Sequence, residues 1–262
     1  MSNAALQVAR TGLDAQNTKM RVIANNLANV NTTGFKRDRA DFETLAYQNI
    51  VTPGAPSDAQ NRFASGVQLG TGVRLAGIGK IATQGTLQTT ENAMDLAIEG
   101  AGYFQVERPD GSTGYTRAGN FSLTAEGNMV TSDGLPLIPA IQVPQGATAV
   151  TIGNNGVVSA SLSGQSEPSE LGQIELANFT NPAGLLSVGN NILTETAASG
   201  APQVGPGGQE GLGNIRQGAL EGSNVNIVEE LVNMIETQRA YEVNSKMISA
   251  TDEMLQFVNQ QI

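Results

Sequence analysis

Two columns of apolar residues, each spaced mainly seven residues apart, lie at the two ends of this 262-residue chain. A seven-residue apolar repeat is typical of a helix that buries one narrow face against other helices. We therefore predict one helix over residues 3–30 and a second over residues 224–262. With their flanking positions, the columns comprise Leu6, Leu13, Met20, Ile23, Leu27 and Val30 at the N-terminal end, and Ile227, Leu231, Met234, Tyr241, Ile248, Leu255 and Ile262 at the C-terminal end.

We call the residues of these two columns the seam. They leave two interpretations open, a helical hairpin within one chain or an assembly of many copies. Narrow seams leave most of each helix polar or small, so one hairpin would bury too little area to offset ordering about 65 residues. That argument favours assembly. Residues 1–50 carry a net charge of +2 and residues 223–262 a net charge of −4, which favours pairing of the two segments.

The middle of the chain, from residue 78 to about residue 220, predicts β structure. Turn-forming residues separate short runs that favour strands, which is the pattern of hairpins. Three hairpins are expected, pairing 103–106 with 114–117, 121–124 with 128–131, and 149–152 with 157–159. Turns this closely spaced indicate an antiparallel meander or a small barrel.

Residues 31–75 lack a dominant period and are predicted to form an extended linking segment. The first helix is expected to end before it, with Gly34 in the left-handed position after the last turn. Prolines and glycines break any regular element farther on. The breaking residues are Pro53, Gly54, Pro56, Gly66, Gly70 and Gly72.

Composition excludes several kinds of site. A net charge of −10 argues against nucleic acid as a partner, because binding phosphates needs clustered Lys and Arg. The absence of Cys excludes disulfides and thiolate metal sites, and the absence of His removes the commonest metal ligand and proton shuttle. We therefore expect neither a cofactor nor a metal.

The sequence is also compatible with two functions other than assembly. Paired carboxylates could perform acid–base chemistry on a glycoside of the cell wall. The candidates are Asp95 with Glu99, or Asp38, Asp41 and Glu43. A soluble binding module with a helical hairpin is the other alternative, and such a module would stay monomeric at high concentration.

The N-terminus shows no basic start followed by an apolar run, and no apolar stretch approaches the ~20 residues that span a bilayer. We therefore expect that any export of this protein proceeds without a cleaved signal peptide.

Residues 24–37 read ANNLANVNTTGFKR, and residues 238–246 read QRAYEVNSK. Together, in this order at the two ends, these stretches closely resemble the signatures of the axial family of bacterial flagella, the rod and hook proteins. Residues 65–73, 98–106 and 115–121 resemble the distal rod members of that family. The matching signature positions are Ala24, Asn25, Asn26, Asn29, Thr33, Gly34, Phe35, Lys36, Gln238, Arg239, Ala240, Asn244 and Lys246.

The resemblance implies a multidomain α+β fold. The terminal helices (1–30 with 224–262) would pair as a coiled-coil-like inner domain, residues 31–75 would link it outward, and residues 76–223 would form an antiparallel β-rich outer domain. It implies a structural subunit rather than an enzyme, which polymerises through the seam into a rigid helical tube. That tube would transmit motor torque to the hook and form part of the export channel, stiffened by residues 46–75.

The implied partners are further copies of the chain, proximal rod subunits, hook or junction subunits, the surrounding P and L rings, and the flagellar type III export apparatus. The implied location is the flagellar basal body, spanning the periplasm towards the outer membrane. A proximal rod or hook subunit is the alternative within the family, and residues 46–75 argue against it.

Overall fold

The chain forms two compact units, and the computed structural model describes residues 2–56, 61–162, 168–209 and 211–260. The helical unit comprises Met1–Leu27, Asp38–Gly79 and Ile227–Ile262, and the β unit comprises Ala28–Arg37 and Lys80–Asn226. Helices at both ends and a β-rich middle make this an α+β protein, which confirms that part of the expected fold class.

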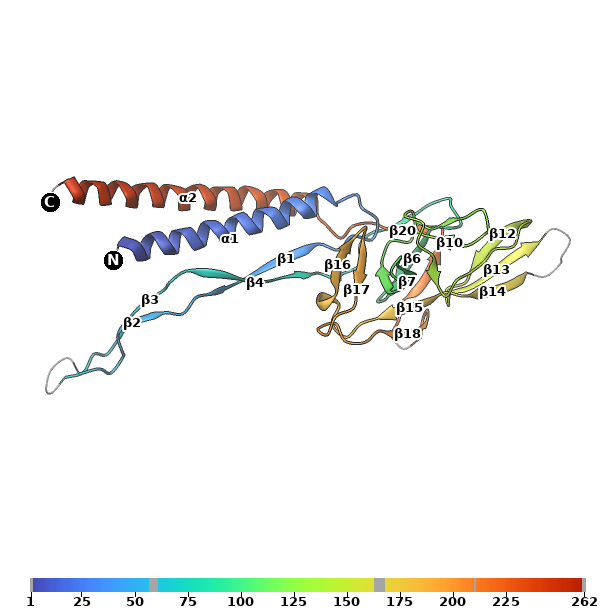
Figure 1. Cartoon of the computed structure of the whole chain (residues 1–262), viewed down its shortest axis with the longest axis horizontal. Coiled ribbons are helices and arrows are strands. Elements are labelled where there is room, and N and C mark those ends of the chain that lie inside the picture. Colours follow the sequence, from blue (N-terminus) through green and yellow to red (C-terminus); the bar gives the residue numbers. More distant parts are fainter. Residues whose placement is uncertain (1, 57–60, 163–167, 210, 261–262) are drawn as a thin grey trace. The chain divides into compact units, whose positions relative to one another are not determined.

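The helical unit contains helix α1 (Ser2–Ala28) and helix α2 (Ile227–Gln260). The two helices lie side by side, with the first residues of α1 and the last residues of α2 at the same end of the pair (Figure 1). A hydrogen bond of 3.2 Å from the Asn26 side chain to the Glu230 carboxylate joins them. The helices predicted over residues 3–30 and 224–262 are therefore present.

The same unit contains a ribbon of paired strands within residues 38–80 (Figure 1). Strand β1 (Asp38–Thr44) pairs with β4 (Val73–Lys80), and β2 (Gln48–Val51) pairs antiparallel with β3 (Val67–Leu69). The sequence pattern predicted an extended linking segment here and did not predict the strand pairs. Most side chains of β2 and β3 are exposed, so these strands lack the alternating apolar pattern by which a half-buried strand is recognised.

The β unit is built from short strands and one short 3-10 helix. The strands are β5 (Leu87–Thr89), β6 (Leu96–Glu99), β7 (Tyr103–Glu107), β8 (Thr113–Thr116), β9 (Ser122–Leu123), β10 (Met129–Val130), β11 (Leu137–Ile138), β12 (Ala147–Ile152), β13 (Val157–Leu162), β14 (Ser169–Gln173), β15 (Glu175–Asn178), β16 (Leu186–Gly189), β17 (Ile192–Thr194), β18 (Gln203–Pro206), β19 (Asn214–Gln217) and β20 (Ala219–Glu221), and the 3-10 helix is Pro182–Gly184.

The three predicted hairpins are confirmed as the antiparallel pairs β7–β8, β9–β10 and β12–β13. The expected meander or barrel is wrong. The seven-stranded sheet runs in the order β16-β17-β8-β7-β15-β18, with β11 also on β7. Strand β19 pairs with β6 and β20 with β5, which sets Gln217 opposite Leu96 and Glu221 opposite Leu87. Turn spacing cannot reveal such pairings, because the paired strands are distant in the chain.

Strand β7 is buried on both faces and organises the core of the β unit. Phe104 and Val106 join one apolar cluster, whereas Tyr103 joins another. In the second cluster the rings of Tyr115 and Phe179 meet edge to face, with centroids 4.8 Å apart. Alternate residues of β7 therefore anchor two layers, as expected of a central strand.

Candidate functional site

The face of α2 that packs within the helical unit is polar. Glu230 and Thr237 are buried, and Asn244, one further seven-residue step along, is half-buried. The buried Asn26 side chain donates to Glu230. A Cβ placed on Gly12 of α1 would lie only 3.1 Å from the Asn244 amide nitrogen. Small and hydrophilic groups therefore make much of this contact, and most large apolar side chains of α2 stay exposed, whereas Met234 and Ile248 are half-buried.

The predicted seam residues differ between the two helices. Ile23 on α1 is buried, while Leu6, Leu13, Met20 and Leu27 on α1 and Val30 beyond its end are half-buried. On α2, Ile227, Leu231 and Tyr241 are exposed, and Met234 and Ile248 are half-buried. The Leu255 side chain and residue Ile262 lie outside the described residues. The chain thus uses the α1 column partly for its own packing and leaves much of the α2 column accessible.

Helix α2 carries a second apolar face that the seven-residue repeat did not single out. Its exposed residues are Val228, Val232, Ile235, Val243, Met247, Met254 and Phe257. Steps of three, four and seven residues keep each group on one side of a helix. Met254 and Phe257 are 62% and 63% exposed. These exposed apolar residues make this face of α2 a candidate interaction surface.

The proline and glycine residues of the linking segment lie in and around the ribbon. Pro53, Gly54, Pro56 and Gly66 lie between β2 and β3, and Gly70 and Gly72 lie between β3 and β4. Gly72 has a φ of +119°, and a Cβ there would collide with the Thr11 hydroxyl of α1. The Val73 N–H donates to that hydroxyl over 3.3 Å. Glycine at position 72 therefore lets the ribbon lie directly against α1.

Asn26 in the N-terminal signature connects α1 to the ribbon by hydrogen bonds. Its amide nitrogen donates to the Asp38 carbonyl, and its amide oxygen accepts from the Asp38 N–H, each over 2.9 Å. The Asn26 side chain thus pairs with both the N–H and the carbonyl of Asp38, as the backbone of a neighbouring strand would. The neighbouring Ala24 and Asn25 are exposed, so α1 also presents signature residues to its surroundings.

The rest of the N-terminal signature belongs to the β unit. Gly34 has a φ of +68°, and a Cβ there would lie 2.5 Å from the Arg117 carbonyl carbon. Its N–H donates to the Glu221 carbonyl over 2.7 Å. Because α1 ends at Ala28, the expectation that Gly34 caps this helix is wrong. Glycine is instead needed there for close approach of two backbones.

Short polar contacts hold the neighbours of Gly34. Thr32 donates its hydroxyl to the Asn29 side chain over 3.1 Å, and the Thr33 carbonyl accepts from the Asn191 amide over 2.6 Å. Phe35 is buried, and the Lys80 ammonium lies 5.5 Å from the centre of its ring. The signature is therefore integrated into the β unit by its own side chains.

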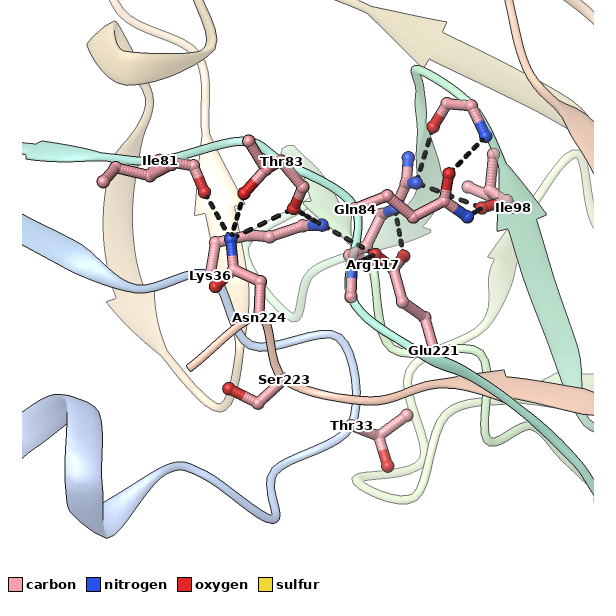
Figure 2. A network of polar contacts seen from close by, with 12 residues as sticks. Thr33, Lys36, Ile81, Thr83, Gln84, Ile98, Arg117, Glu221, Ser223 and Asn224 are labelled. Carbon is pink, nitrogen blue, oxygen red and sulfur yellow. Dashed lines mark hydrogen bonds and ion pairs between the residues drawn. The ribbon is translucent and has the colours of Figure 1, made fainter. Parts of the chain in front are cut away.

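Lys36 ends this stretch in a buried ionic cluster with Glu221 and Arg117 (Figure 2). The Lys36 Nζ lies 2.7 Å from Glu221 Oε1, and the Arg117 Nε lies 2.5 Å from Glu221 Oε2. Side chains of Lys36 and Arg117 are 6% exposed, and that of Glu221 is 1% exposed. We call these three residues the buried triad.

The remaining polar atoms of the buried triad are also used. Lys36 Nζ donates to the Thr83 carbonyl over 2.8 Å, and Glu221 Oε1 accepts from the Gly85 N–H over 2.8 Å. Arg117 donates to the carbonyls of Ile98, Gly100 and Gly102. Beside the triad, Asn224 donates to the Ile81 and Thr83 carbonyls and accepts from the Arg37 N–H (Figure 2). The cluster therefore joins the two chain segments that border the helical unit, near residues 36 and 221.

The sequence pattern did not single out Arg117 or Glu221. Arg117 stands in the 115–121 stretch, and Glu221 has no distinctive neighbours in the chain. Lys36 is 185 residues from Glu221, so only the fold reveals that they meet.

Burial and charge act in opposite directions on the titration of this cluster. Burial raises the pKa of Glu221, but Arg117 and Lys36 lower it more, so this pKa lies below its ordinary value of 4.5. Burial lowers the pKa of Lys36, and the neighbouring Glu221 carboxylate only partly offsets that effect. The triad is thus a charged cluster whose glutamate stays ionised in the fold.

We predict an acid-dependent loss of stability from this cluster. Because the pKa of Glu221 is depressed by folding, its contribution is full above about pH 4.5 and is lost as pH falls through the folded value. Urea unfolding of wild type and Glu221→Gln, followed by near-ultraviolet circular dichroism of tyrosine, should show a gap in midpoints at pH 7 that narrows at more acidic pH. A gap that widens on acidification contradicts the prediction.

The C-terminal signature is mostly exposed on α2. Gln238, Arg239 and Lys246 are exposed, and Ala240 and Asn244 are half-buried. Packing within one chain therefore does not account for the exposed signature residues, in contrast to those at positions 33–36.

The carboxylates considered for acid–base catalysis have structural contacts. Asp95 accepts from the Thr90 hydroxyl and the Asn92 amide over 2.7 and 3.0 Å, whereas Glu99 is exposed. On β1, the Asp38 carboxylate accepts a hydrogen bond from the Asn25 amide. Asp41 forms a salt bridge with Arg39, and Glu43 forms one with Arg74. These contacts hold turns and strands in place and give no support to the glycosidase alternative.

Among the described residues, no three or more Asp or Glu side chains gather in a group suited to a metal ion. None of the described helices is long and apolar enough to cross a membrane.

Three family models match the chain. The flagella basal body rod protein model matches residues 6–36, the flagellar hook protein FlgE/F/G D1 domain model matches residues 97–160, and the flagellar basal body rod FlgEFG protein C-terminal model matches residues 216–261. The first and third include most of the seam and of both signatures, and the second includes part of the β unit.

Full-length relatives agree with these matches, and each is named flagellar basal-body rod protein FlgG. The protein from Buchnera aphidicola subsp. Acyrthosiphon pisum is 51% identical, with 98% of each chain covered. That from Caulobacter vibrioides is 47% identical with the same coverage, and that from Bacillus subtilis is 38% identical over 94% of each chain. The chain therefore belongs to the family of flagellar basal-body rod proteins.

Proposed function

We propose that this chain is a subunit of the flagellar distal rod, which polymerises through its terminal helices into a rigid helical tube. The tube transmits motor torque to the hook and forms part of the export channel. In this proposal residues 1–30 and 224–262 form a coiled-coil-like inner domain, residues 31–75 link it to an outer β domain over 76–223, and the role is structural rather than enzymatic.

The exposed apolar faces of α2 carry this proposal. Within one chain α2 buries Glu230 and Thr237 and half-buries Asn244, whereas most of its larger apolar side chains stay exposed. Covering them with neighbouring copies removes apolar area from water and supplies the driving force for assembly. Different surfaces meeting head to tail generate an open helical assembly rather than a closed ring.

The same proposal assigns the partners and the location. The tube continues from proximal rod subunits to hook or junction subunits, passes through the P and L rings, and spans the periplasm in the basal body. Its subunits are delivered by the flagellar type III export apparatus without signal cleavage. Relatives that carry the name flagellar basal-body rod protein support this assignment.

Electron microscopy of the concentrated full-length protein tests the function directly. We expect straight tubes with a central channel. Curved tubes favour a hook subunit, and monodisperse particles at high concentration support the soluble binding module and contradict the proposal.

We predict that residues 46–63 stiffen the tube. Their deletion removes β2 and its pairing with β3, so the ribbon can no longer pack between neighbouring copies. The variant that lacks residues 46–63 should form curved or flexible tubes, with a shorter persistence length than wild-type tubes in electron micrographs. Replacing the segment with a Gly/Ser stretch of equal length is the control and should give the same flexibility, whereas straight tubes from the deletion contradict the prediction.

A further inference from the structure

An open groove lies within the helical unit, between the first turns of α1 and the β2–β3 part of the ribbon. It has a volume of about 950 Å³. Leu6, Val8 and Arg10 line it from α1, and Ile50 and Leu69 line it from the ribbon. The lining is therefore mainly apolar, and it also includes the polar side chains of Gln7, Gln48 and Thr71 and the cationic Arg10.

The chain leaves the ribbon wall of this groove uncovered. The strand register sets Leu69 opposite Gln48, and Leu69, Gln48 and Ile50 all line the groove. Ile50 is 61% exposed and Leu69 is 46% exposed. An apolar groove of this kind suits an amphipathic helix laid along it.

The chain also displays an exposed apolar helix surface. Val243, Met247, Met254 and Phe257 form an exposed stripe on α2, about 21 Å long at 1.5 Å per residue. Glu253 lies beside Met254 and Phe257 around a shallow hollow. The stripe is thus apolar, with an anionic residue at its edge.

We propose that the groove between α1 and the β2–β3 ribbon of one copy holds the Val243–Phe257 stripe of α2 from a second copy. The inference rests on the proposed function and assigns the two surfaces that meet. Within one copy the stripe cannot fill the groove, because its side chains are exposed while α2 packs through its polar face. Arg10 in the groove and Glu253 beside the stripe carry opposite charges, which aligns the two surfaces.

The ribbon and α1 both contribute to this pairing. The groove needs a wall from each, and Gly72 brings the ribbon against α1. Groove and stripe are different surfaces, so each copy offers one of each, and the contact repeats from copy to copy. The ribbon thereby connects neighbouring copies rather than covering only its own chain.

Cysteine cross-linking tests the pairing, because the chain has no native Cys. Ile50→Cys and Met254→Cys are prepared separately, mixed under polymerising conditions, and treated with a short bismaleimide. We expect a cross-linked dimer in the mixture, and at most a tenth as much with either variant alone. A mixture of Ile50→Cys with Leu123→Cys, an exposed position in the β unit, is the matched control.

Charge reversal gives an independent readout of the same contact. Arg10→Glu and Glu253→Arg should each raise the critical concentration for polymerisation several-fold, and the double variant should return to within about twofold of wild type. If wild type forms tubes but neither the cross-link nor the rescue appears, the pairing is overturned and the proposed function stands. If wild type forms no tubes, the proposed function fails and the inference fails with it.

Discussion

Leu231→Asp should abolish tube formation at concentrations where the wild-type protein polymerises completely. Leu231 lies in the α2 seam column and is 43% exposed, so the monomer tolerates the change. In a tube this position would be covered by a neighbouring copy. Burying an unpaired carboxylate there costs well over the 1.4 kcal/mol or so that corresponds to a tenfold change in an equilibrium constant. We expect the critical concentration to rise more than about tenfold.

Sedimentation followed by electron microscopy measures this effect, and circular dichroism confirms that the β unit stays folded. Ser249→Asp is the matched control, since it adds the same charge at an exposed polar position of α2 outside the seam column. It should polymerise close to the wild-type level. Normal tubes from Leu231→Asp would refute the seam assignment.

Glu221→Ala should destabilise the β unit by about 3–5 kcal/mol, the range for breaking a buried ion pair by removing one partner. The change leaves the Lys36 ammonium and the Arg117 guanidinium buried without their shared carboxylate. It also removes the acceptor of the Gly85 N–H. Unpaired buried charges are costly because neither water nor a counterion replaces the lost contact.

Urea unfolding of the full chain measures this loss through near-ultraviolet circular dichroism, which reports on Tyr103 and Tyr115 buried in the β unit. The double variant Lys36→Met/Glu221→Gln should recover part of the stability, because it removes one of the two cations. Asp110→Asn at the exposed Arg108–Asp110 pair is the control, and its midpoint should hardly change. An equally small effect of Glu221→Ala would show that the buried triad is not a structural anchor.

Local patterns predicted local structure well. The apolar columns predicted α1 and α2, and turn residues such as those around Gly111 and Gly127 predicted three hairpins. Strand order was not predictable in the same way. Pairing β20 with β5 brings Glu221 opposite Leu87, and no feature within a few residues of either position indicates the other.

The candidate interaction surfaces were likewise only partly predictable from the sequence. Exposed seam residues such as Leu231 were predicted from spacing, yet spacing could not show that α2 turns its polar face towards α1. The second apolar face of α2 had a signal in the steps between Val243, Met247, Met254 and Phe257. The seven-residue column obscured it, because both patterns occupy one helix.

The two terminal helices, the β-rich middle, the short hairpins and the signatures shared with rod proteins could all be predicted from the sequence. These features depend on side chains a few residues apart, whose spacing and turn preferences act locally. The tertiary structure alone decided which faces of α2 stay open, how the ribbon and α1 form a groove, and how Lys36 and Arg117 meet Glu221. Those arrangements join residues far apart in the chain, and only folding, through the burial of apolar area and the pairing of buried charges, brings them into contact.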